Sequence, residues 1–420
     1  MGRTRLLALA CLVIGTQPLA AQGPRTAARG FSADRLARID RVLQEYVDSG
    51  RIAGAVVVVL HDGEVAYRRA VGWGDVESHR TMTFQTLFRI ASQTKALTSV
   101  VILSLMEEGK LSVNDPVSRY IPAFAHTTVV TRSDTGRVIK AASRQITIRD
   151  LLTHSAGISY GNDSLVAPLY AAKGLGPAAG WGWYTADKDE PICTTIERLA
   201  TLPFVAQPGE RWVYGYNTDI LGCVAERAAG MPFDELIRTR ITGPLHMNDT
   251  YFFVPAGAAD RLATVYASDS TNHIRRAPDG PRGQGNYVLG PRRNFSGGAG
   301  LISTASDYAV FLQMLLNGGE LDGARVLAPH TVDLMTHNQS GMLFDTSGAM
   351  GFGFGFGITQ RYGANGMASV GTFNWGGAYG SQYFVDPAEH LVVVFMINQL
   401  PNRADIQAKF QTLVYQALTN

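Results

Sequence analysis

The chain has 420 residues, of which 46% are hydrophobic and 17% charged, so its composition is typical of a folded globular protein and excludes a disordered one. This length suits one large domain or two packed lobes. The 37 basic residues fall to 35 if a leader with Arg3 and Arg5 is removed, which equals the 35 acidic residues and leaves no positive excess for binding nucleic acid.

Residues 1–21 are typical of a secretory signal peptide. Two arginines precede an apolar stretch, and small residues for cleavage follow at Ala20 and Ala21. The stretch is shorter than the roughly 20 residues that cross a membrane. A buried N-terminal strand and lipid attachment at Cys11 are the alternatives. We expect an exported protein, periplasmic or secreted, without stable membrane insertion and with one mature domain over 22–420.

The first ordered element is a predicted helix over Ala33–Asp48, capped by Ser32. A hairpin follows, because two β-rich segments flank the turn residues Asp62-Gly63. Its strands cover Ala53–Leu60 and Val65–Val71.

The middle of the chain has helical patterns instead. The predicted helices are Ser92–Glu108, Thr147–Thr153, Thr218–Ala229, Phe233–Ile241 and Ser306–Asn317. Arg132–Ser143 is polar and is interpreted as a loop with a turn at Asp134-Thr135-Gly136. Tyr160–Pro191 is rich in glycine and aromatic residues, and is either a wall over the site or a surface excursion.

Two strands, Tyr383–Asp386 and Leu391–Asn398, and a helix from about Asp405 to Leu418 complete the chain. Strands at both ends with helices between them favour an α/β (α+β) fold whose antiparallel sheet is built from both termini. We expect a sheet lobe over about 30–90 and 295–420. An all-helical lobe over about 91–294 would be inserted into it, with the site at the seam.

The mature chain retains two of the three cysteines, Cys193 and Cys223. They could pair in an oxidising compartment, or Cys223 could be an inert thiol in the core. The nine histidines show no metal-ligand spacing, so we expect no metal and no other cofactor.

The tetrad Ser92-Gln93-Thr94-Lys95 opens an apolar helix, and is the most informative pattern in the chain. Residues three apart lie on one helix face, so Lys95 stands behind Ser92. A helix N-terminus favours negative charge, which suits both a serine alkoxide and an oxyanion. Lys95 could accept the serine proton. The alternative is a helix cap followed by a surface lysine, although the chain has few lysines.

The flanking residues resemble a known family. Residues 88–95 (FRIASQTK) resemble the nucleophile block of class C β-lactamases and of their esterase relatives, the family VIII carboxylesterases. Further blocks occur in the family's order at residues 146–157, 208–214, 296–304 and 353–357. The resemblance to this serine β-lactamase superfamily covers nearly the whole mature chain. It implies the β-lactamase/transpeptidase-like fold: an antiparallel sheet flanked by helices, with a helical lobe.

Tyr214 is the second catalytic residue that the resemblance implies. A phenol near Lys95 can shuttle a proton between Ser92 and the leaving group. The family usually places Asn two residues after this tyrosine, but here Tyr216 stands there and Asn217 is one later. We assign Asn217 to substrate binding and keep Tyr216 as an alternative phenol. Aromatic packing at a helix start is the structural alternative for both tyrosines.

Trp375-Gly376-Gly377 stands where β-lactamases carry Lys-Thr-Gly, as in many family VIII esterases. The resemblance places the oxyanion hole at the backbone N–H groups of Ser92 and Ala378, and glycines allow a carbonyl to approach closely. A strand softened by glycine is the structural alternative. Without the motif lysine the site lacks a cation for a substrate carboxylate, unless an arginine such as Arg361 folds back.

Three patterns are interpreted as non-catalytic. The Gly-x-Ser-x-Gly match at Gly157–Gly161 would make Ser159 a nucleophile, but it lacks the strand before it and the helix after it. His154 near a helix end is expected to be structural. The glycines and phenylalanines over Gly351–Gly357 predict a strand rather than a dinucleotide fingerprint.

We therefore expect a serine hydrolase that forms an acyl-enzyme on Ser92 and acts on a small-molecule ester or amide, as a carboxylesterase for short-chain esters. A β-lactamase or a D-alanyl-D-alanine carboxypeptidase is the alternative within the class. A non-catalytic cell-wall-binding homologue is the alternative outside it.

Overall fold

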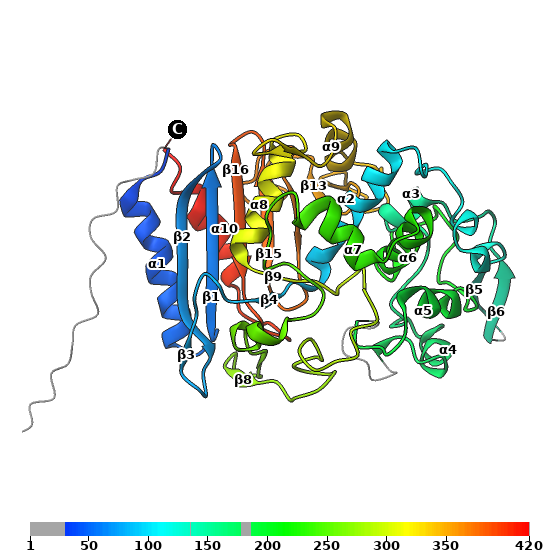
Figure 1. Cartoon of the computed structure of the whole chain (residues 1–420), viewed down its shortest axis with the longest axis horizontal. Helices are drawn as coiled ribbons and strands as arrows, with labels where there is room; N and C mark the ends of the chain where they lie inside the picture. The colour runs from blue at the N-terminus through cyan, green and yellow to red at the C-terminus, as the bar shows by residue number, and fades with distance from the viewer. Residues whose placement is uncertain (1–29, 135, 178–185, 420) are drawn as a thin grey trace, which may run out of the picture.

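The computed structural model describes residues 30–134, 136–177 and 186–419. Its largest element is an antiparallel sheet with the strand order β12-β13-β14-β15-β16-β1-β2-β3 (Figure 1). The strands are β1 (Gly54–His61), β2 (Glu64–Asp75), β3 (Arg80–Thr81), β12 (Met350–Phe352), β13 (Gly357–Thr359), β14 (Phe373–Gly376), β15 (Gln382–Asp386) and β16 (Leu391–Met396). Strands from the two ends of the chain meet where β1 pairs with β16. The predicted fold class is confirmed.

Strand β1 is buried along its whole length because helices cover both faces of the sheet. Val56 and Val58 belong to the core on one face, together with α2 (Thr94–Glu107) and α8 (Ala305–Leu316). Val57 and Val59 belong to the core on the other face, together with α1 (Ala33–Asp48) and α10 (Ile406–Tyr415). A strand covered on both faces carries a continuous apolar run instead of an alternating one.

Local sequence accounts for the boundaries of α1. Ser32 caps the helix by accepting a hydrogen bond from the Arg35 N–H. The buried residues of α1 recur every three or four positions, which gives the helix one apolar face against the sheet; they are Leu36, Ile39, Leu43 and Tyr46.

The second lobe holds the remaining helices between β4 (Phe88–Arg89) and β9 (Ile302–Ser303) (Figure 1). They are α2, α3 (Ile148–Leu152), α4 (Ala167–Ala172), α5 (Ile192–Leu199), α6 (Asn217–Ala229) and α7 (Phe233–Ile237), which continues as a π-helix over Arg238–Thr242. Every residue from Thr94 to Leu105 of α2 is buried, so this helix is covered on all sides. Helix α9 (Pro329–Thr336) follows α8.

Two predictions of local structure were wrong. Arg132–Ser143 was expected to be a loop, but β5 (Thr128–Ser133) and β6 (Gly136–Ala141) form a hairpin there. Much of this hairpin is exposed, so its residues are polar and no apolar alternation marks the strands. Gly351–Gly357 was expected to be one strand. It instead contains the end of β12, a turn over Gly353–Phe356 and the start of β13, and the turn is closed by a hydrogen bond from the Gly353 N–H to the Phe356 carbonyl.

Other short elements were not identified from the sequence. They are α5, α9 and the two-stranded sheets β7 (Tyr266–Ser268) with β8 (Ile274–Arg276) and β10 (Glu320–Leu321) with β11 (Ala324–Arg325). Within Tyr160–Pro191 the structure contains α4, while residues 178–185 and the predicted signal peptide lie outside the described residues.

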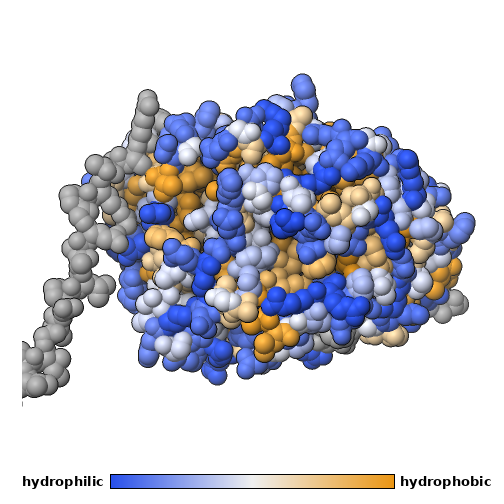
Figure 2. All heavy atoms as spheres, in the orientation of Figure 1, coloured by the Kyte–Doolittle hydropathy of each residue, from blue (hydrophilic) through white to orange (hydrophobic). Residues whose placement is uncertain are grey.

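The molecular surface is mainly polar on the face shown in Figure 2, with small apolar areas between hydrophilic ones. No helix in the described ranges is long and apolar enough to cross a membrane.

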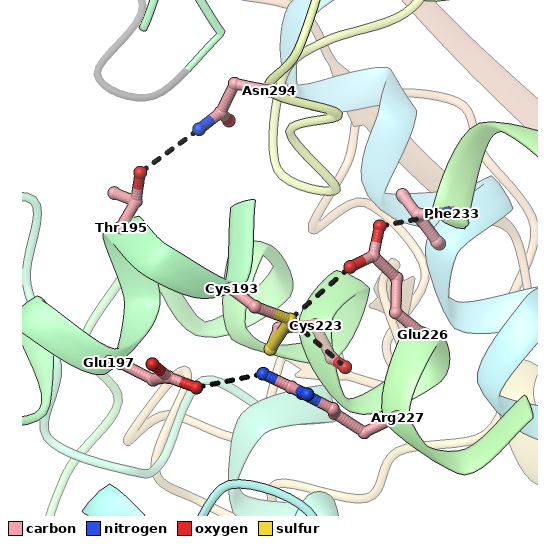
Figure 3. The surroundings of a disulfide bond; sticks show 8 residues. All are labelled: Cys193, Thr195, Glu197, Cys223, Glu226, Arg227, Phe233 and Asn294. Carbon is pink, nitrogen blue, oxygen red and sulfur yellow. Dashed lines mark hydrogen bonds and ion pairs between the residues drawn. A yellow bond between two sulfur atoms is a disulfide. The ribbon is translucent and has the colours of Figure 1, made fainter. Parts of the chain in front are cut away.

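Cys193 of α5 and Cys223 of α6 form a disulfide, which decides between the two possibilities left open by the sequence (Figure 3). The Glu226 carboxylate nearby accepts the Phe233 N–H at 3.0 Å, and Arg227 pairs with Glu197. The bond joins two neighbouring helices of the second lobe and closes a segment that includes the Tyr214 region.

We predict that replacing both cysteines with alanine lowers the free energy of unfolding by about 2–4 kcal/mol, because the unfolded chain loses a cross-link. Urea unfolding of the wild type and the double variant measures the difference. Each single alanine variant serves as the control and should match the double variant. Two titratable thiols in the unreduced, denatured wild type would contradict the pairing.

Candidate active site

Ser92 lies at the entry to the helical lobe. Strand β4 leads into a 3₁₀ turn over Ala91–Gln93, which runs directly into α2. Ala91 has a φ of 44°, a left-handed conformation that is uncommon for a residue with a side chain. This turn leaves Ser92 partly accessible while its neighbours Ala91 and Gln93 are buried.

Lys95 lies one turn behind Ser92 and is 1% exposed. Its Nζ donates three hydrogen bonds: to Ser92 Oγ at 3.2 Å, to the Tyr160 hydroxyl at 2.9 Å and to the Gly298 carbonyl at 2.7 Å. An ammonium group has three donors, so each one is satisfied. The predicted neighbours Ser92 and Lys95 are therefore in direct contact.

The Gly298 carbonyl is held in position by a buried acid on α6. Asp219 Oδ1 accepts hydrogen bonds from Ser296 Oγ at 2.5 Å and from the Gly298 N–H at 3.2 Å. A Cβ at Gly298 would lie 2.4 Å from Asp219 Oδ2, so a side chain there would displace the Asp219 carboxylate. The loop at 296–298 thus links Asp219 of α6 to Lys95, because it donates to the Asp219 carboxylate and accepts a hydrogen bond from Lys95 at Gly298.

Tyr214 also faces Lys95. The Lys95 Nζ lies 4.7 Å from the centroid of the Tyr214 ring, within the range of a cation–π contact. Trp375 Nε1 donates a hydrogen bond of 3.1 Å to the Tyr214 oxygen. That bond occupies one lone pair of the oxygen and leaves the phenolic proton available to another acceptor.

Around this hydrogen bond lies a cluster of aromatic rings. Neighbouring centroids are 5.0–6.4 Å apart, the spacing at which tilted and edge-to-face pairs are favourable. We call this cluster the aromatic wall; its members are Trp212, Tyr214, Phe344, Phe352 and Trp375. The wall limits how far Tyr214 can move from Lys95.

Tyr160 was missed by the sequence analysis. It lies inside the Gly157–Gly161 match that was set aside, and its position beside Lys95 depends on a contact 65 residues apart. No local signal marks it. Its neighbour Ser159 is buried and accepts a hydrogen bond from the Gly161 N–H at 3.1 Å, and it does not line the cavity at Ser92.

The structure does not bring Tyr216 or Asn217 to this cavity. Tyr216 is fully buried, and its hydroxyl accepts the Gly176 N–H at 2.9 Å. The Asn217 side chain is also fully buried, and its Nδ2 donates to His154 Nδ1 at 2.8 Å and to the Val213 carbonyl at 3.2 Å. The predicted substrate contact of Asn217 therefore has no geometric support.

His154 is the partner of Asn217 and packs on Tyr214. Its ring centroid lies 4.7 Å from that of Tyr214. Burial, and secondarily the positive charge of Lys95, lower the pKa of His154 well below its ordinary value. A neutral His154 accepts the Asn217 N–H at Nδ1, so this pair fixes the backbone that carries Tyr214. The structural interpretation of His154 fits this geometry.

Strand β14 brings Trp375, Gly376 and Gly377 beside the serine turn. A Cβ at Gly377 would lie 2.5 Å from the Ile90 carbonyl, so a side chain there would push the strand away. The N–H of Ala378 donates to no acceptor within the described ranges. Ser92 and Ala378 both line the cavity described below.

These elements surround a cavity of about 450 Å³. Its lining combines the serine, the aromatic wall, backbone and amide side chains; the residues are Ser92, Tyr214, Asn365, Asn374, Trp375, Gly376, Gly377, Ala378, Gln382, Tyr383, Phe384 and Gln411. None of these lining residues carries a charged side chain, and Arg361 is not among them. The described ranges contain no group of three or more His, Cys, Asp or Glu side chains that could hold a metal ion.

Comparison with known proteins identifies relatives over most of the chain. The family model described as Beta-lactamase matches residues 39–416. Esterase EstB of Burkholderia gladioli is 33% identical over 87% of this chain and 91% of its own length. Protein Rv1367c of Mycobacterium tuberculosis is 35% identical, with 86% and 89% covered.

Among solved structures, EstCE1, described as a hydrolase with promiscuous acyltransferase activity, superposes with a TM-score of 0.76. It is 28% identical, and the match covers 91% of this chain and 98% of EstCE1.

We predict that stability declines as the pH falls below about 6.5, the ordinary pKa of histidine, because the unfolded chain then binds a proton that buried His154 does not. The contribution of His154 is complete above that pH. A His154→Gln variant should be less stable than the wild type at pH 7.5 but lose stability less steeply on acidification, by up to about 1.4 kcal/mol per pH unit.

Urea unfolding between pH 5 and 7.5 measures both slopes, with exposed His330→Gln as the control. Equal slopes in the wild type and His154→Gln would contradict a neutral His154.

Proposed function

Because this chain belongs to the Beta-lactamase family and is a serine hydrolase, we propose that it is an exported carboxylesterase that forms an acyl-enzyme on Ser92. The observation that carries the proposal is the contact of the buried Lys95 ammonium with Ser92 Oγ at the floor of an uncharged cavity. The family membership was predicted from the sequence and is confirmed.

In the first step the Lys95/Tyr214 pair accepts the proton of Ser92. The pair does so in its form without net charge, as amine with phenol or as ammonium with phenolate. Ser92 Oγ then attacks the ester carbonyl carbon, and the carbonyl electrons move onto oxygen. The N–H groups of Ser92 and Ala378 hold that oxyanion.

In the second step the tetrahedral intermediate collapses and the bond to the alcohol oxygen breaks. Tyr214 gives its proton to the departing oxygen, which returns the pair to its neutral form. Water then attacks the acyl-enzyme, the pair takes one proton from it and returns that proton to Ser92 Oγ. The carboxylic acid leaves and the enzyme is restored. Tyr160 and the Gly298 carbonyl position the Lys95 amine throughout.

The cavity supports neutral esters as substrates. The Trp375 side chain has one N–H donor and no charge, and this N–H already donates a hydrogen bond to Tyr214. A β-lactam or a peptidoglycan stem carries a carboxylate near the scissile bond, and among the described residues no cationic side chain lines this cavity to receive it. The esterase relative EstB supports the same choice.

Export is supported by two independent features. The signal-like start at residues 1–21 is one. The disulfide between Cys193 and Cys223 is the other, because such bonds persist in oxidising compartments outside the cytosol.

A β-lactamase or D-alanyl-D-alanine carboxypeptidase is the second candidate, since such enzymes share the fold and the serine chemistry. A non-catalytic cell-wall-binding homologue is disfavoured by the intact contact of Lys95 with Ser92.

We predict that Lys95→Met and Tyr214→Phe each lower kcat for p-nitrophenyl butyrate by about 10²-fold or more, because each removes a positioned proton carrier. Tyr216→Phe is the matched control and should change kcat far less, since its hydroxyl binds Gly176. Steady-state kinetics measure all three. A larger loss for Tyr216→Phe than for Tyr214→Phe would move the working phenol to Tyr216.

We also predict that p-nitrophenyl acetate and butyrate are hydrolysed with a higher kcat/KM than a chromogenic cephalosporin. Loss of a charge-assisted contact to the carboxylate costs about 1.5–3 kcal/mol, or roughly 10- to 150-fold in binding. Spectrophotometric assays of both substrates with one enzyme preparation decide the matter. Equal or greater efficiency on the cephalosporin would replace the esterase by the β-lactamase alternative.

A further inference from the structure

The cavity at Ser92 does not end at the aromatic wall. Alternate residues of a strand point to opposite faces of a sheet, and paired residues share a face. Trp375 pairs with Tyr383, and both lie on the face toward α2. Gly376 pairs with Gln382, whose side chain is on the opposite face, toward α10. Both faces nevertheless line the same cavity.

The passage between the two faces exists because of Gly376 and Gly377. Pairing of β14 with β13 ends at Asn374, whereas its pairing with β15 continues to Gly376. The glycine pair therefore lies at an edge without a neighbouring strand on that side and without side chains. The cavity passes over this edge from Ser92 to four amide side chains, which we call the amide subsite: Asn365, Asn374, Gln382 and Gln411.

The orientation of the glutamine amides follows from their backbone partners. Gln382 faces the Gln407 carbonyl at 2.9 Å, and Gln411 faces the Asn365 carbonyl at 3.3 Å. A carbonyl only accepts hydrogen bonds, so the Nε2 atom of each glutamine must point to it. Asn374 makes a longer contact of the same kind with the Gly357 carbonyl.

The amide oxygens remain available. In the described part of the chain, Oε1 of Gln382 and Oε1 of Gln411 accept no hydrogen bond. Their residues are half-buried and line the cavity. These amide oxygens are uncharged acceptors whose orientation is fixed by the backbone, so they suit a neutral group with O–H donors. The amide oxygens themselves give no favourable partner to a carboxylate or phosphate, and an alkyl chain would leave them unpaired. The second N–H of each glutamine amide can donate to the oxygen of the same hydroxyl group or of its neighbour.

We propose that the amide subsite binds hydroxyl groups on the alcohol part of the ester, so that the preferred substrates are short-chain esters of polyhydroxylated alcohols. This inference rests on the proposed esterase function. The alcohol part is chosen because Tyr214 protonates the departing oxygen and is hydrogen-bonded to Trp375, the residue just before the glycine passage. A departing alcohol held at Tyr214 is directed along Trp375 and over Gly376 toward the amides.

The test compares glycerol 1-monobutyrate with propyl butyrate, using titration of released butyric acid. The alcohols have the same carbon chain and differ only in two hydroxyl groups. Both esters give the same butyryl-enzyme, so the ratio of their kcat/KM values reports binding and acylation alone. Dividing by the ratio of their alkaline hydrolysis rates removes the difference in intrinsic reactivity.

The corrected ratio should favour glycerol monobutyrate by about tenfold in the wild type, the effect of one or two neutral hydrogen bonds. Gln382→Met and Gln411→Met should each lower that ratio by about threefold or more. Gln416→Met is the matched control. Gln416 is at the end of α10, the helix that carries Gln411; its side chain donates to the Arg35 carbonyl and lies outside the cavity. It should keep the wild-type ratio.

A corrected wild-type ratio near one would overturn the proposal, and so would a ratio that both subsite variants retain. Because the ratio is measured within one preparation, partial misfolding of a variant cancels. Failure to hydrolyse either ester would instead overturn the esterase function itself, which separates the two ideas.

Discussion

A buried lysine ammonium is the constraint on which the rest of the site depends. Removing a charge from water is costly unless every donor finds an acceptor. Lys95 meets this requirement with Ser92 Oγ, the Tyr160 hydroxyl and the Gly298 carbonyl, which come from three separate parts of the chain. Any shift of the segments that carry Tyr160 and Gly298 against α2 would leave a donor unpaired. The buried charge therefore also holds these segments in register with α2.

The same requirement explains the buried polar groups that hold the neighbours of Lys95 in place. Asp219 holds the loop that presents the Gly298 carbonyl, and the His154–Asn217 pair holds the backbone before Tyr214. Neither group reaches the cavity. Buried polar groups outside the cavity thus fix the geometry of the site. The described residues that line the cavity supply hydroxyl, backbone, aromatic and amide groups.

Sequence reasoning succeeded where the determinant is local or is repeated along the chain. The pairing of Ser92 with Lys95 follows from helical spacing, and the antiparallel sheet follows from strand patterns at both ends. Sequence reasoning failed where the position of a side chain depends on contacts with residues far away in the chain. Tyr160 touches Lys95 across 65 residues without any local mark, and a shift of one residue at the start of α6 turns Asn217 inward to His154. The β5–β6 hairpin was missed because an exposed ribbon needs no apolar alternation.

The pairing of β1 with β16 determines at which stage of synthesis and folding the site can be completed. Strands β1 and β16 are paired although they lie near opposite ends of the chain. Strands β14 and β15 lie between β16 and the free edge of the sheet. Contacts between residues so far apart in sequence form late in folding. During synthesis, Ser92 and Lys95 emerge long before the strand that faces them. A ribosome-bound chain thus carries the proposed nucleophile without strand β14 opposite it, so we expect ester cleavage only after the last strands have been made.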